Sequence, residues 1–325
     1  MKLVREHIDA FPFDAPPYVL ERREALLLAD PLPSPMKRAR EYPPIEVAHL
    51  GAAYVERAFA PPVGVYESAD IRIEWQNMNG RQPFYHRNTG VDELSFQVCG
   101  ERTLITELGT VELRPGDFSR IPNGVAHDNF GRHDVHLLFY VPGPVRELVA
   151  PSRQAEYLST PFPGWTPAVI NELTTEGVGG PGQDLALSPV DEALLLQHAE
   201  QDAERIQVLH PEGEGLQWLY RSAAVAIGRS RKASDDGAVY TRHRDACEVQ
   251  YQIQGERTLV TQRGSVHLVP GDFVQIPRGI AFTSLHSGPS EHLALASTLP
   301  IPQVAPALRQ GTRLPADELA RLRGA

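Results

Sequence analysis

The chain has 325 residues, which is more than one compact barrel needs and about right for two domains with connecting segments. Its formal charge is −10, from 31 Lys and Arg against 41 Asp and Glu, and it has no dense basic run, which argues against a nucleic-acid-binding surface. The two cysteines are too few for a disulfide framework, and no run approaches the roughly 20 apolar residues of a membrane helix.

Residues 1–60 predict an N-terminal arm that lies over the rest of the molecule. The two cysteines without a disulfide framework lead us to expect a cytoplasmic protein, and the first residues lack the continuous apolar core of a signal peptide. Many of the 29 prolines in the chain stand in short loops between apolar runs, a pattern that favours many short strands over long helices.

Two segments of the chain are copies of each other. Residues 93–127 align without a gap with residues 248–282, at an offset of 248 − 93 = 155. The copies share the stretch G-E-R-T-L, a glycine turn, the stretch P-G-D-F and the pattern I-P-x-G. An internal repeat of this kind indicates that one supersecondary unit occurs twice, so the sequence predicts two barrels of the same type.

Within the first copy the hydrophobic pattern has a period close to two. Leu94, Phe96 and Val98 alternate with polar residues and predict a strand that ends in a turn at Gly100. Short antiparallel strands separated by Gly and Pro turns are typical of a sandwich or small barrel. The other predicted strands cover 103–106, begin at 111, and cover 118–121.

The best helix candidate lies between the copies, from Ser188 to about Val208, where a Ser cap, an early Pro and early acids mark a helix start. A shorter helix is predicted after Pro315. We therefore expect a mainly β protein with short helical connectors. Its expected parts are an N-terminal arm (1–60), a first barrel (61–150), a connector with a helix (151–215), a second barrel (216–300) and a C-terminal tail (301–325).

A His, an acid and a second His stand at fixed places around the first copy. His86 precedes it by seven residues, Glu93 begins it and His127 closes it. If the strands bring the three side chains to one interior face, two imidazoles and one carboxylate bind a divalent metal and leave adjacent coordination positions open. This set of ligands is the one used in non-haem Fe(II) oxygen chemistry, so the sequence predicts a metal site with Fe(II) as the first choice.

The second copy provides an internal comparison for this prediction. It keeps the scaffold residues and the carboxylate but has Thr and Phe where the two histidines stand in the first copy. The positions that correspond to His86, Asn88, Glu93 and His127 are Thr241, His243, Glu248 and Phe282. We therefore expect the first barrel to bind the metal and the second to be degenerate.

These residues resemble the two motifs of the cupin superfamily. The first motif takes the form H-x-N-x4-E-x6-G from His86 to Gly100, and the second takes the form G-x5-P-x-G-x2-H from Gly116 to His127. The resemblance implies two double-stranded β-helix (jelly-roll) barrels, a bicupin. Many cupins have His where this chain has Asn88, so Asn88 is an oxygen ligand, an orienting residue or a substrate contact.

A narrower resemblance is to the homogentisate 1,2-dioxygenases, two-barrel cupins that cleave an aromatic ring. They carry a stretch similar to Tyr85–Asn88, followed by a Glu ligand and a later His, and a segment similar to 92–124. In that family the iron is in the C-terminal barrel, whereas here the complete triad is in the first. Gentisate-type dioxygenases are a similar ring-cleaving group that usually keeps both histidines of the first motif.

Further residues near the motifs are candidates for substrate binding or for orienting the ligands. Arg120 stands on the predicted strand before Pro122 and is a candidate for holding a carboxylate or phenolate, although an outward position is equally compatible. Tyr85, Arg87 and Tyr140 are weaker candidates.

The pair His133 and His136 follows the second motif, and one of the two is a candidate acid or base in the cavity, with a loop or surface position as the preferred interpretation. Asp117 and Asp272 are the same residue in both copies, so we expect them to stabilise turns.

The resemblance implies a non-haem Fe(II) dioxygenase that cleaves a hydroxylated aromatic ring, with a small aromatic substrate of the homogentisate or gentisate class and O2 as reactants. We expect a homo-oligomer without nucleic-acid or membrane partners. Two alternatives stay open. The same ligands hold Mn(II), Zn(II) or Ni(II), which suits a metal-dependent isomerase, hydrolase or decarboxylase. The incomplete second barrel suits a non-catalytic bicupin that binds a small molecule.

Overall fold

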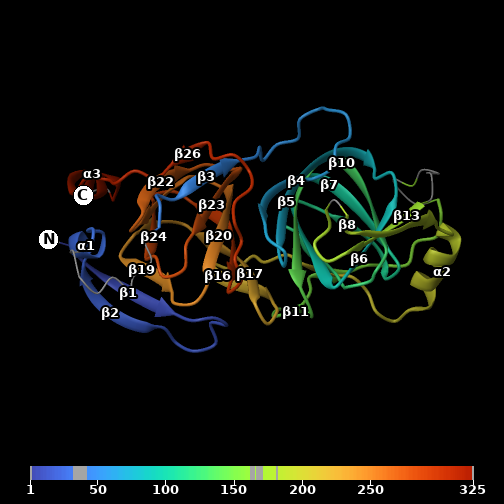
Figure 1. Cartoon of the computed structure of the whole chain (residues 1–325), viewed down its shortest axis with the longest axis horizontal. Coiled ribbons are helices and arrows are strands. Elements are labelled where there is room, and N and C mark those ends of the chain that lie inside the picture. The colour runs from blue at the N-terminus through green and yellow to red at the C-terminus, as the bar shows by residue number, and fades with distance from the viewer. Residues whose placement is uncertain (1, 32–41, 162–164, 166–170, 181, 324–325) are drawn as a thin grey trace.

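A computed structural model describes residues 2–31, 42–161, 165, 171–180 and 182–323 of the chain. Parts of the predicted arm, connector and tail lie outside these ranges. The described residues form two β-barrels that stand side by side, with short helices at the periphery (Figure 1). The predicted all-β jelly-roll fold of two barrels with short helical connectors is confirmed. None of the described helices is long and apolar enough to cross a membrane.

The first barrel contains one copy of the repeat, and its long strands run antiparallel in the order β5, β10, β7, β9. These strands place the predicted site residues. In chain order they are β4 (Val63–Glu67), β5 (Arg72–Arg81), β6 (Tyr85–Thr89), β7 (Val91–Thr106), β8 (Gly109–Leu113), β9 (Phe118–Ile121) and β10 (His127–Pro142).

The predicted turn at Gly100 is wrong, because β7 continues through this residue to Thr106. Gly100 has a φ of 67°, and a Cβ atom there would lie 2.0 Å from the carbonyl oxygen of His133. The register of β7 against β10 also shifts between Arg132 and Val135. The glycine therefore marks a β-bulge, which bends the strand without ending it.

The second barrel repeats this arrangement with shorter strands. Here the equivalent glycine, Gly255, does separate two strands, so the predicted turn exists in this copy only. The strands are β16 (Gly215–Arg221), β17 (Val225–Lys232), β18 (Asp235–Asp236), β19 (Val239–His243), β20 (Cys247–Gln254), β21 (Arg257–Thr261), β22 (Gly264–Leu268), β23 (Asp272–Ile276), β24 (Phe282–His286) and β25 (Ser290–Ser297).

The two barrels pack against each other through one hydrophobic core. Leu94 and Phe96 of β7 belong to the same buried cluster as Tyr251 of β20 and Phe273 of β23. Both faces of β7 are consequently covered, one by the second barrel and the other by the interior of its own barrel. This explains why the polar residues that alternate with Leu94 and Phe96 are buried as well.

The segment that precedes each barrel in the sequence packs on the other barrel. The leading segment of the chain consists of β1 (Leu3–Asp9), β2 (Tyr18–Arg23), α1 (Glu24–Leu27) and β3 (Glu46–His49), and that of the second half consists of β13 (Asn171–Glu176), β14 (Asp184–Pro189), α2 (Glu192–Gln201) and β15 (Gln207–Leu209). Strand β1 pairs in parallel with β19 of the second barrel, and β13 pairs in parallel with β6 of the first. Likewise β3 pairs with β23, and β15 pairs with β9. Figure 1 shows this exchange, with β1, β2 and β3 on the second barrel and β13 and α2 on the first.

The connecting helix is shorter than the sequence predicts. Ser188 and Pro189 end strand β14, and the helix starts only after Asp191, whose side chain accepts a hydrogen bond from the backbone N–H of Leu194 at 3.1 Å. The acidic cap residue therefore replaces the expected Ser cap. The predicted C-terminal helix is confirmed as α3 (Ala316–Leu322). The remaining short strands are β11 (Arg146–Glu147), β12 (Arg153–Gln154) and β26 (Arg309–Gln310).

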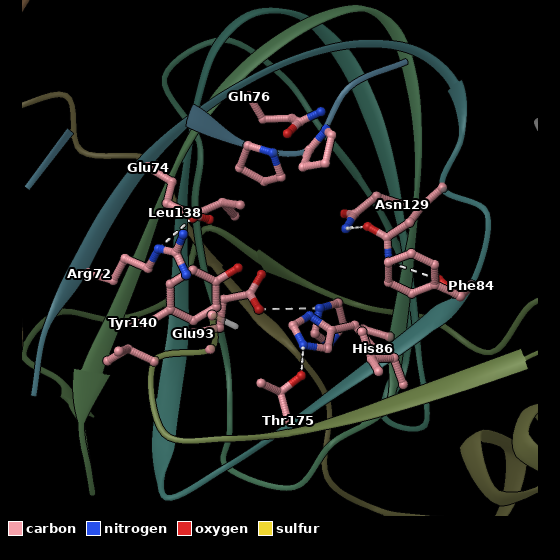
Figure 2. Close-up of a pocket in the computed structure, with 18 of the residues that line it drawn as sticks. Arg72, Glu74, Gln76, Phe84, His86, Glu93, Asn129, Leu138, Tyr140 and Thr175 are labelled. Carbon is pink, nitrogen blue, oxygen red and sulfur yellow. Dashed lines mark hydrogen bonds and ion pairs between the residues drawn. The ribbon is translucent and has the colours of Figure 1, made fainter. Parts of the chain in front are cut away.

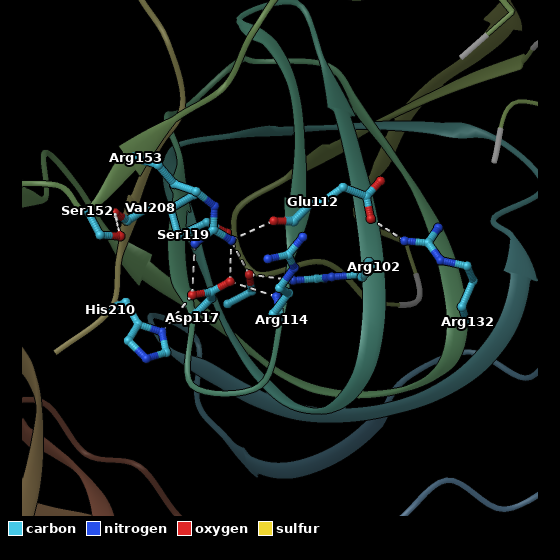
Figure 3. A network of polar contacts seen from close by, with 11 residues as sticks. Arg102, Glu112, Arg114, Asp117, Ser119, Arg132, Ser152, Arg153, Val208 and His210 are labelled. Carbon is cyan, nitrogen blue, oxygen red and sulfur yellow. Dashed lines mark hydrogen bonds and ion pairs between the residues drawn. The ribbon is translucent and has the colours of Figure 1, made fainter. Parts of the chain in front are cut away.

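Asp117 is a structural residue of the turn before β9, as its presence in both copies suggests. Its carboxylate accepts hydrogen bonds from the backbone N–H of Arg114 at 2.7 Å and from Arg153, and it lies 2.8 Å from Nδ1 of His210 (Figure 3). Asp272 of the second barrel has the same kinds of partners, namely Val269, Arg309 and His49. Each aspartate thus connects a turn of its barrel to the segments that cover it.

Candidate metal centre

His86, Glu93 and His127 converge at one end of a cavity in the first barrel. They come from β6, β7 and β10, and one donor atom from each lies within 4.8 Å of the others. The register of the sheet explains this convergence, because His127 pairs directly with His86 across β10 and β6. Nε2 of His127 lies 3.2 Å from Oε2 of Glu93. The structure therefore brings together the three side chains that the sequence singles out.

The protonation states of these groups suit a cation. Burial lowers the pKa of His86 to about 4, so its imidazole is neutral at neutral pH. Burial alone raises the pKa of Glu93, but His127 and His86 outweigh it and bring that pKa down to about 2. Burial lowers the pKa of His127, and the adjacent Glu93 reverses the shift and raises it. Two imidazoles and a carboxylate in this arrangement fit a divalent metal ion, whose binding displaces the proton shared by His127 and Glu93.

Hydrogen bonds from outside the triad orient the two imidazoles. Nδ1 of His127 lies 3.3 Å from the carbonyl oxygen of Val125, which leaves Nε2 to face Glu93. Nε2 of His86 lies 2.8 Å from Oγ1 of Thr175 on β13. Thr175 comes from the leading segment of the second half of the chain, and no local pattern in the sequence indicates its position.

Asn88 lies beside the triad and outside the lining of the cavity. Its Nδ2 donates a hydrogen bond to Oε2 of Glu93 at 2.8 Å, and its Oδ1 is buried without a hydrogen-bond partner among the described residues. Of the three roles predicted for Asn88, this geometry favours the orienting one, because a fixed carboxylate presents its oxygens in one direction.

The cavity extends from the triad through the interior of the barrel and has a volume of about 270 Å³. The apolar residues of its lining include Phe59, Phe84, Leu138 and Val178. The polar residues of the lining include His136 and, as Figure 2 shows, Arg72, Glu74, Gln76, Asn129 and Tyr140. Of the weaker sequence candidates, Tyr140 lines the cavity as predicted.

Three of the candidate residues do not line the cavity, and for Arg120 the outward alternative holds. Arg120 pairs across β9 and β7 with Leu94, which faces the second barrel, and its side chain binds Glu147 at 2.6 Å and Asp92 at 3.2 Å. Because successive strand residues face opposite sides, the two neighbours of His86 also point away from the cavity. Arg87 binds Glu107 and Glu172, whereas the hydroxyl of Tyr85 donates to Glu192 of α2 at 2.7 Å.

The two histidines after the second motif, His133 and His136, lie in different environments. His133 is exposed in the bulge, with a φ of 47°, as the preferred interpretation predicted. His136 is 1% exposed and lines the cavity, so the preferred interpretation is wrong for this residue and the alternative of a cavity position holds. Its placement follows from β10, where His136, Leu138 and Tyr140 share the inward face.

Two functional candidates on β5 are missing from the sequence predictions. Arg72 and Glu74 both line the cavity, with Nε of Arg72 2.6 Å from Oε1 of Glu74. Burial raises the pKa of Glu74 to about 7, which Arg72 opposes and Glu93 reinforces. The alternation of inward residues from Arg72 to Met78 was the available signal, because every second residue of this run lines the cavity.

The second barrel has a smaller cavity of about 170 Å³ at the corresponding place. Thr241 and Phe282 line it where the first barrel has the two histidines. Nε2 of His243 lies 2.6 Å from Oε2 of Glu248, so the carboxylate that persists in this copy is bound to an imidazole. Phe13 of the leading segment lies against His243, with ring centroids 4.8 Å apart.

No family model matches the chain, and no curated protein matches it significantly. Among solved structures, the chain is similar to a Cupin 2 conserved barrel domain protein from Leptotrichia buccalis, with 10% identity and a TM-score of 0.45 over 75% of this chain and 92% of that one. It is also similar to a mutant of the oxalate decarboxylase OxdC from Bacillus subtilis, with 9% identity and a TM-score of 0.45 over 83% and 82% of the two chains. The narrower resemblance to homogentisate dioxygenases stays a prediction.

Proposed function

We propose that the protein is a mononuclear non-haem Fe(II) dioxygenase that opens the ring of a small hydroxylated aromatic acid of the homogentisate or gentisate class. The observation that carries this proposal is the convergence of His86, Glu93 and His127 at the end of a partly apolar cavity. Ferrous iron held by these side chains would supply open coordination positions and the redox chemistry that joins substrate and O2.

The size and lining of the cavity support a single-ring substrate. Its volume of about 270 Å³ is just below the range of sites for drug-sized ligands, which begins at about 300 Å³. Phe59, Phe84 and Leu138 offer apolar surface for a planar ring, and β13 and the residues after it add Leu173 and Val178 to the lining.

Arg72 supports an acidic substituent on the ring. Its guanidinium lines the cavity and can bind a carboxylate through two parallel hydrogen bonds. The adjacent Glu74 offsets this charge only in part, because a carboxyl with a pKa of about 7 is partly protonated at neutral pH. A carboxylate at this end of the ring would leave the hydroxyl groups to face the triad.

Oxygen uptake tests the proposal directly. Protein loaded anaerobically with Fe(II) is mixed with O2 and gentisate, homogentisate, catechol or hydroxyanthranilate, and uptake is expected with at least one of them. His127→Ala should abolish the uptake, whereas Phe282→Ala, at the same repeat position of the second barrel, should retain it. The absence of uptake with all four compounds would refute the proposal.

A second candidate is a non-oxidative enzyme, such as a decarboxylase or isomerase, with Mn(II), Zn(II) or Ni(II) in the same cage. The observation in its favour is Glu74, a cavity carboxyl whose raised pKa of about 7 allows it to donate a proton near neutral pH. Metal analysis of anaerobically purified protein separates the two candidates. Turnover of an aromatic or aliphatic acid without O2, lost in Glu74→Gln, would favour the second.

A further inference from the structure

A buried aspartate and histidine form a hydrogen-bonded pair in the wall of the metal cavity. Nδ1 of His136 lies 2.9 Å from Oδ2 of Asp134, and Nε2 of Gln97 donates to the other oxygen, Oδ1, at 2.6 Å. Both oxygens of Asp134 are therefore engaged. The aspartate is 0% exposed and the histidine 1%.

This geometry determines which nitrogen of His136 can react. A carboxylate only accepts hydrogen bonds, so Nδ1 of His136 carries the proton of the bond to Asp134. Nε2 is then the nitrogen with a free lone pair. Because His136 lines the same cavity as His86, Glu93 and His127, that lone pair is available to a molecule bound in the cavity.

Burial and the nearby guanidinium of Arg102 favour the neutral form of His136. Burial lowers the pKa of His136, and the buried guanidinium of Arg102 lowers it further, while Asp134 and Glu93 act in the opposite direction. Once the ring takes up a proton, the carboxylate of Asp134 stabilises the resulting positive charge at hydrogen-bond distance.

The second barrel shows that the aspartate is not needed to build the strand. His292 has the position of His136, since it pairs with Gln252 as His136 pairs with Gln97, and it also lines a cavity. Its neighbour, however, is Ser290, and Gln252 donates to the hydroxyl of this serine at 2.9 Å. A serine thus satisfies the glutamine equally well. The carboxylate partner occurs only in the barrel with the converging metal donors.

We propose that His136, held by Asp134, is the general base that takes a proton from a hydroxyl group of the aromatic substrate as it enters the cavity. The inference rests on the proposed function. The O–H bond of the substrate breaks, its proton forms the Nε2–H bond of His136, and the electron pair stays on the oxygen as a phenolate. The phenolate complements the positive charge of the metal centre, and the imidazolium complements Asp134.

A proton count tests the assignment without relying on turnover. The holoprotein is loaded with Zn(II), which holds the site without oxygen chemistry, and 4-nitrocatechol serves as the probe because its absorbance changes when it ionises. The titration uses weakly buffered solution with a pH indicator, at a pH where the free probe keeps both protons. Wild-type protein is expected to bind the probe as an anion without releasing a proton to the solution, because His136 holds the proton that the probe loses.

In His136→Gln, each bound probe should release one proton to the solution, and binding should be at least about tenfold weaker because a charge-assisted interaction is lost. Asp134→Asn leaves the imidazole in place but removes its counter-charge, so it should also release the proton. His292→Gln is the matched control from the second barrel and should behave as wild type. Metal content is measured for every variant.

A readout on the wild-type protein covers the case in which His136→Gln does not fold. In the nuclear magnetic resonance spectrum of selectively labelled histidines, one side chain should change from imidazole to imidazolium when 4-nitrocatechol binds. Failure of the wild type to bind the probe would refute the proposed function, and the inference with it. Binding with the same proton count in wild type, His136→Gln and Asp134→Asn would refute the role of His136 alone.

Discussion

In the second barrel, Nε2 of His243 lies 2.6 Å from Oε2 of Glu248, and in the first barrel Nδ2 of Asn88 lies 2.8 Å from Oε2 of Glu93 at the same repeat positions. The polar partner of the carboxylate is thus kept in both copies, although its chemistry differs. In the first barrel, where the partner is an amide, the carboxylate faces two imidazoles. The residue at this repeat position, Asn88 in the first barrel and His243 in the second, therefore indicates whether the glutamate of that barrel is available to bind a cation.

Removal of one imidazole should abolish metal binding in the first barrel. In His127→Ala the remaining two donors do not enclose a cation, so we expect the bound divalent metal to fall from about one per chain to near zero. Phe282→Ala, at the equivalent position of the second barrel, should keep its metal. Equal metal content in the two variants, measured after purification and dialysis, would contradict the assignment.

The second barrel should become a metal site when its residues are changed to those of the first. The triple variant Thr241→His, His243→Asn, Phe282→His recreates both imidazoles and frees Glu248 from its bond to His243. We expect the stoichiometry of Zn(II) binding, measured by isothermal titration calorimetry, to rise from about one to about two. The double variant that retains His243 should bind the second ion more weakly, because Glu248 stays engaged.

The stability of the metal-free protein should depend on pH through Glu74. The pKa of this carboxyl is about 7 in the folded protein and 4.5 in a model peptide, so folding favours its protonated form. Its contribution to the free energy of unfolding is fully present below pH 4.5 and is lost as the pH rises through about 7. A pKa shift of this size corresponds to about 3 kcal/mol of the free energy of unfolding.

Urea unfolding at pH 4.5 and pH 8 checks this dependence. From pH 4.5 to pH 8, the free energy of unfolding of Glu74→Gln should rise relative to that of the wild type by up to about 3 kcal/mol, because the glutamine does not ionise. Glu67→Gln is the control, since Glu67 also lies near Arg72, at 3.9 Å, but its side chain is 39% exposed. If the difference between Glu74→Gln and wild type is the same at both pH values, the buried carboxyl has no such role.

Two glycines of the first barrel should differ sharply in their response to alanine. Both have positive φ, 67° at Gly100 and 83° at Gly124, so backbone strain should lower the free energy of unfolding by about 1 kcal/mol in each variant. At Gly100 the new Cβ would also lie 2.0 Å from the carbonyl oxygen of His133, whereas at Gly124 nothing lies within 4 Å. We expect Gly100→Ala to lower the free energy of unfolding by about 4 kcal/mol or more. Similar losses in the two variants, measured by urea unfolding, would exclude a steric role for the bulge.

The sequence predicts the two barrels well because an ungapped repeat carries both the strand spacing and the turn residues. The convergence of His86, Glu93 and His127 can also be predicted, since alternation within each strand and short connections between strands limit where those side chains can point. The same alternation excludes Arg87 and Tyr85 from the cavity, which the motif-based interpretation overlooked.

Other parts of the site depend on contacts that no local pattern carries. Thr175 reaches His86 only because β13 pairs in parallel with β6. Arg120 binds Glu147, which lies outside the repeated segment, so the repeat carries no signal of this contact. The bulge at Gly100 has the same composition as a turn, and only the pairing of β7 with β10 along its whole length distinguishes the two.

The exchange of leading segments makes the two halves of the chain interlocked pieces. If the polypeptide were severed between β12 and β13, each fragment would carry the cover of the other fragment's barrel and lack its own. Neither fragment could close its cavity alone, and His86 would regain the hydroxyl of Thr175 only after the fragments reassembled. The candidate metal centre is therefore a property of the intact polypeptide, even though His86, Glu93 and His127 all come from one barrel.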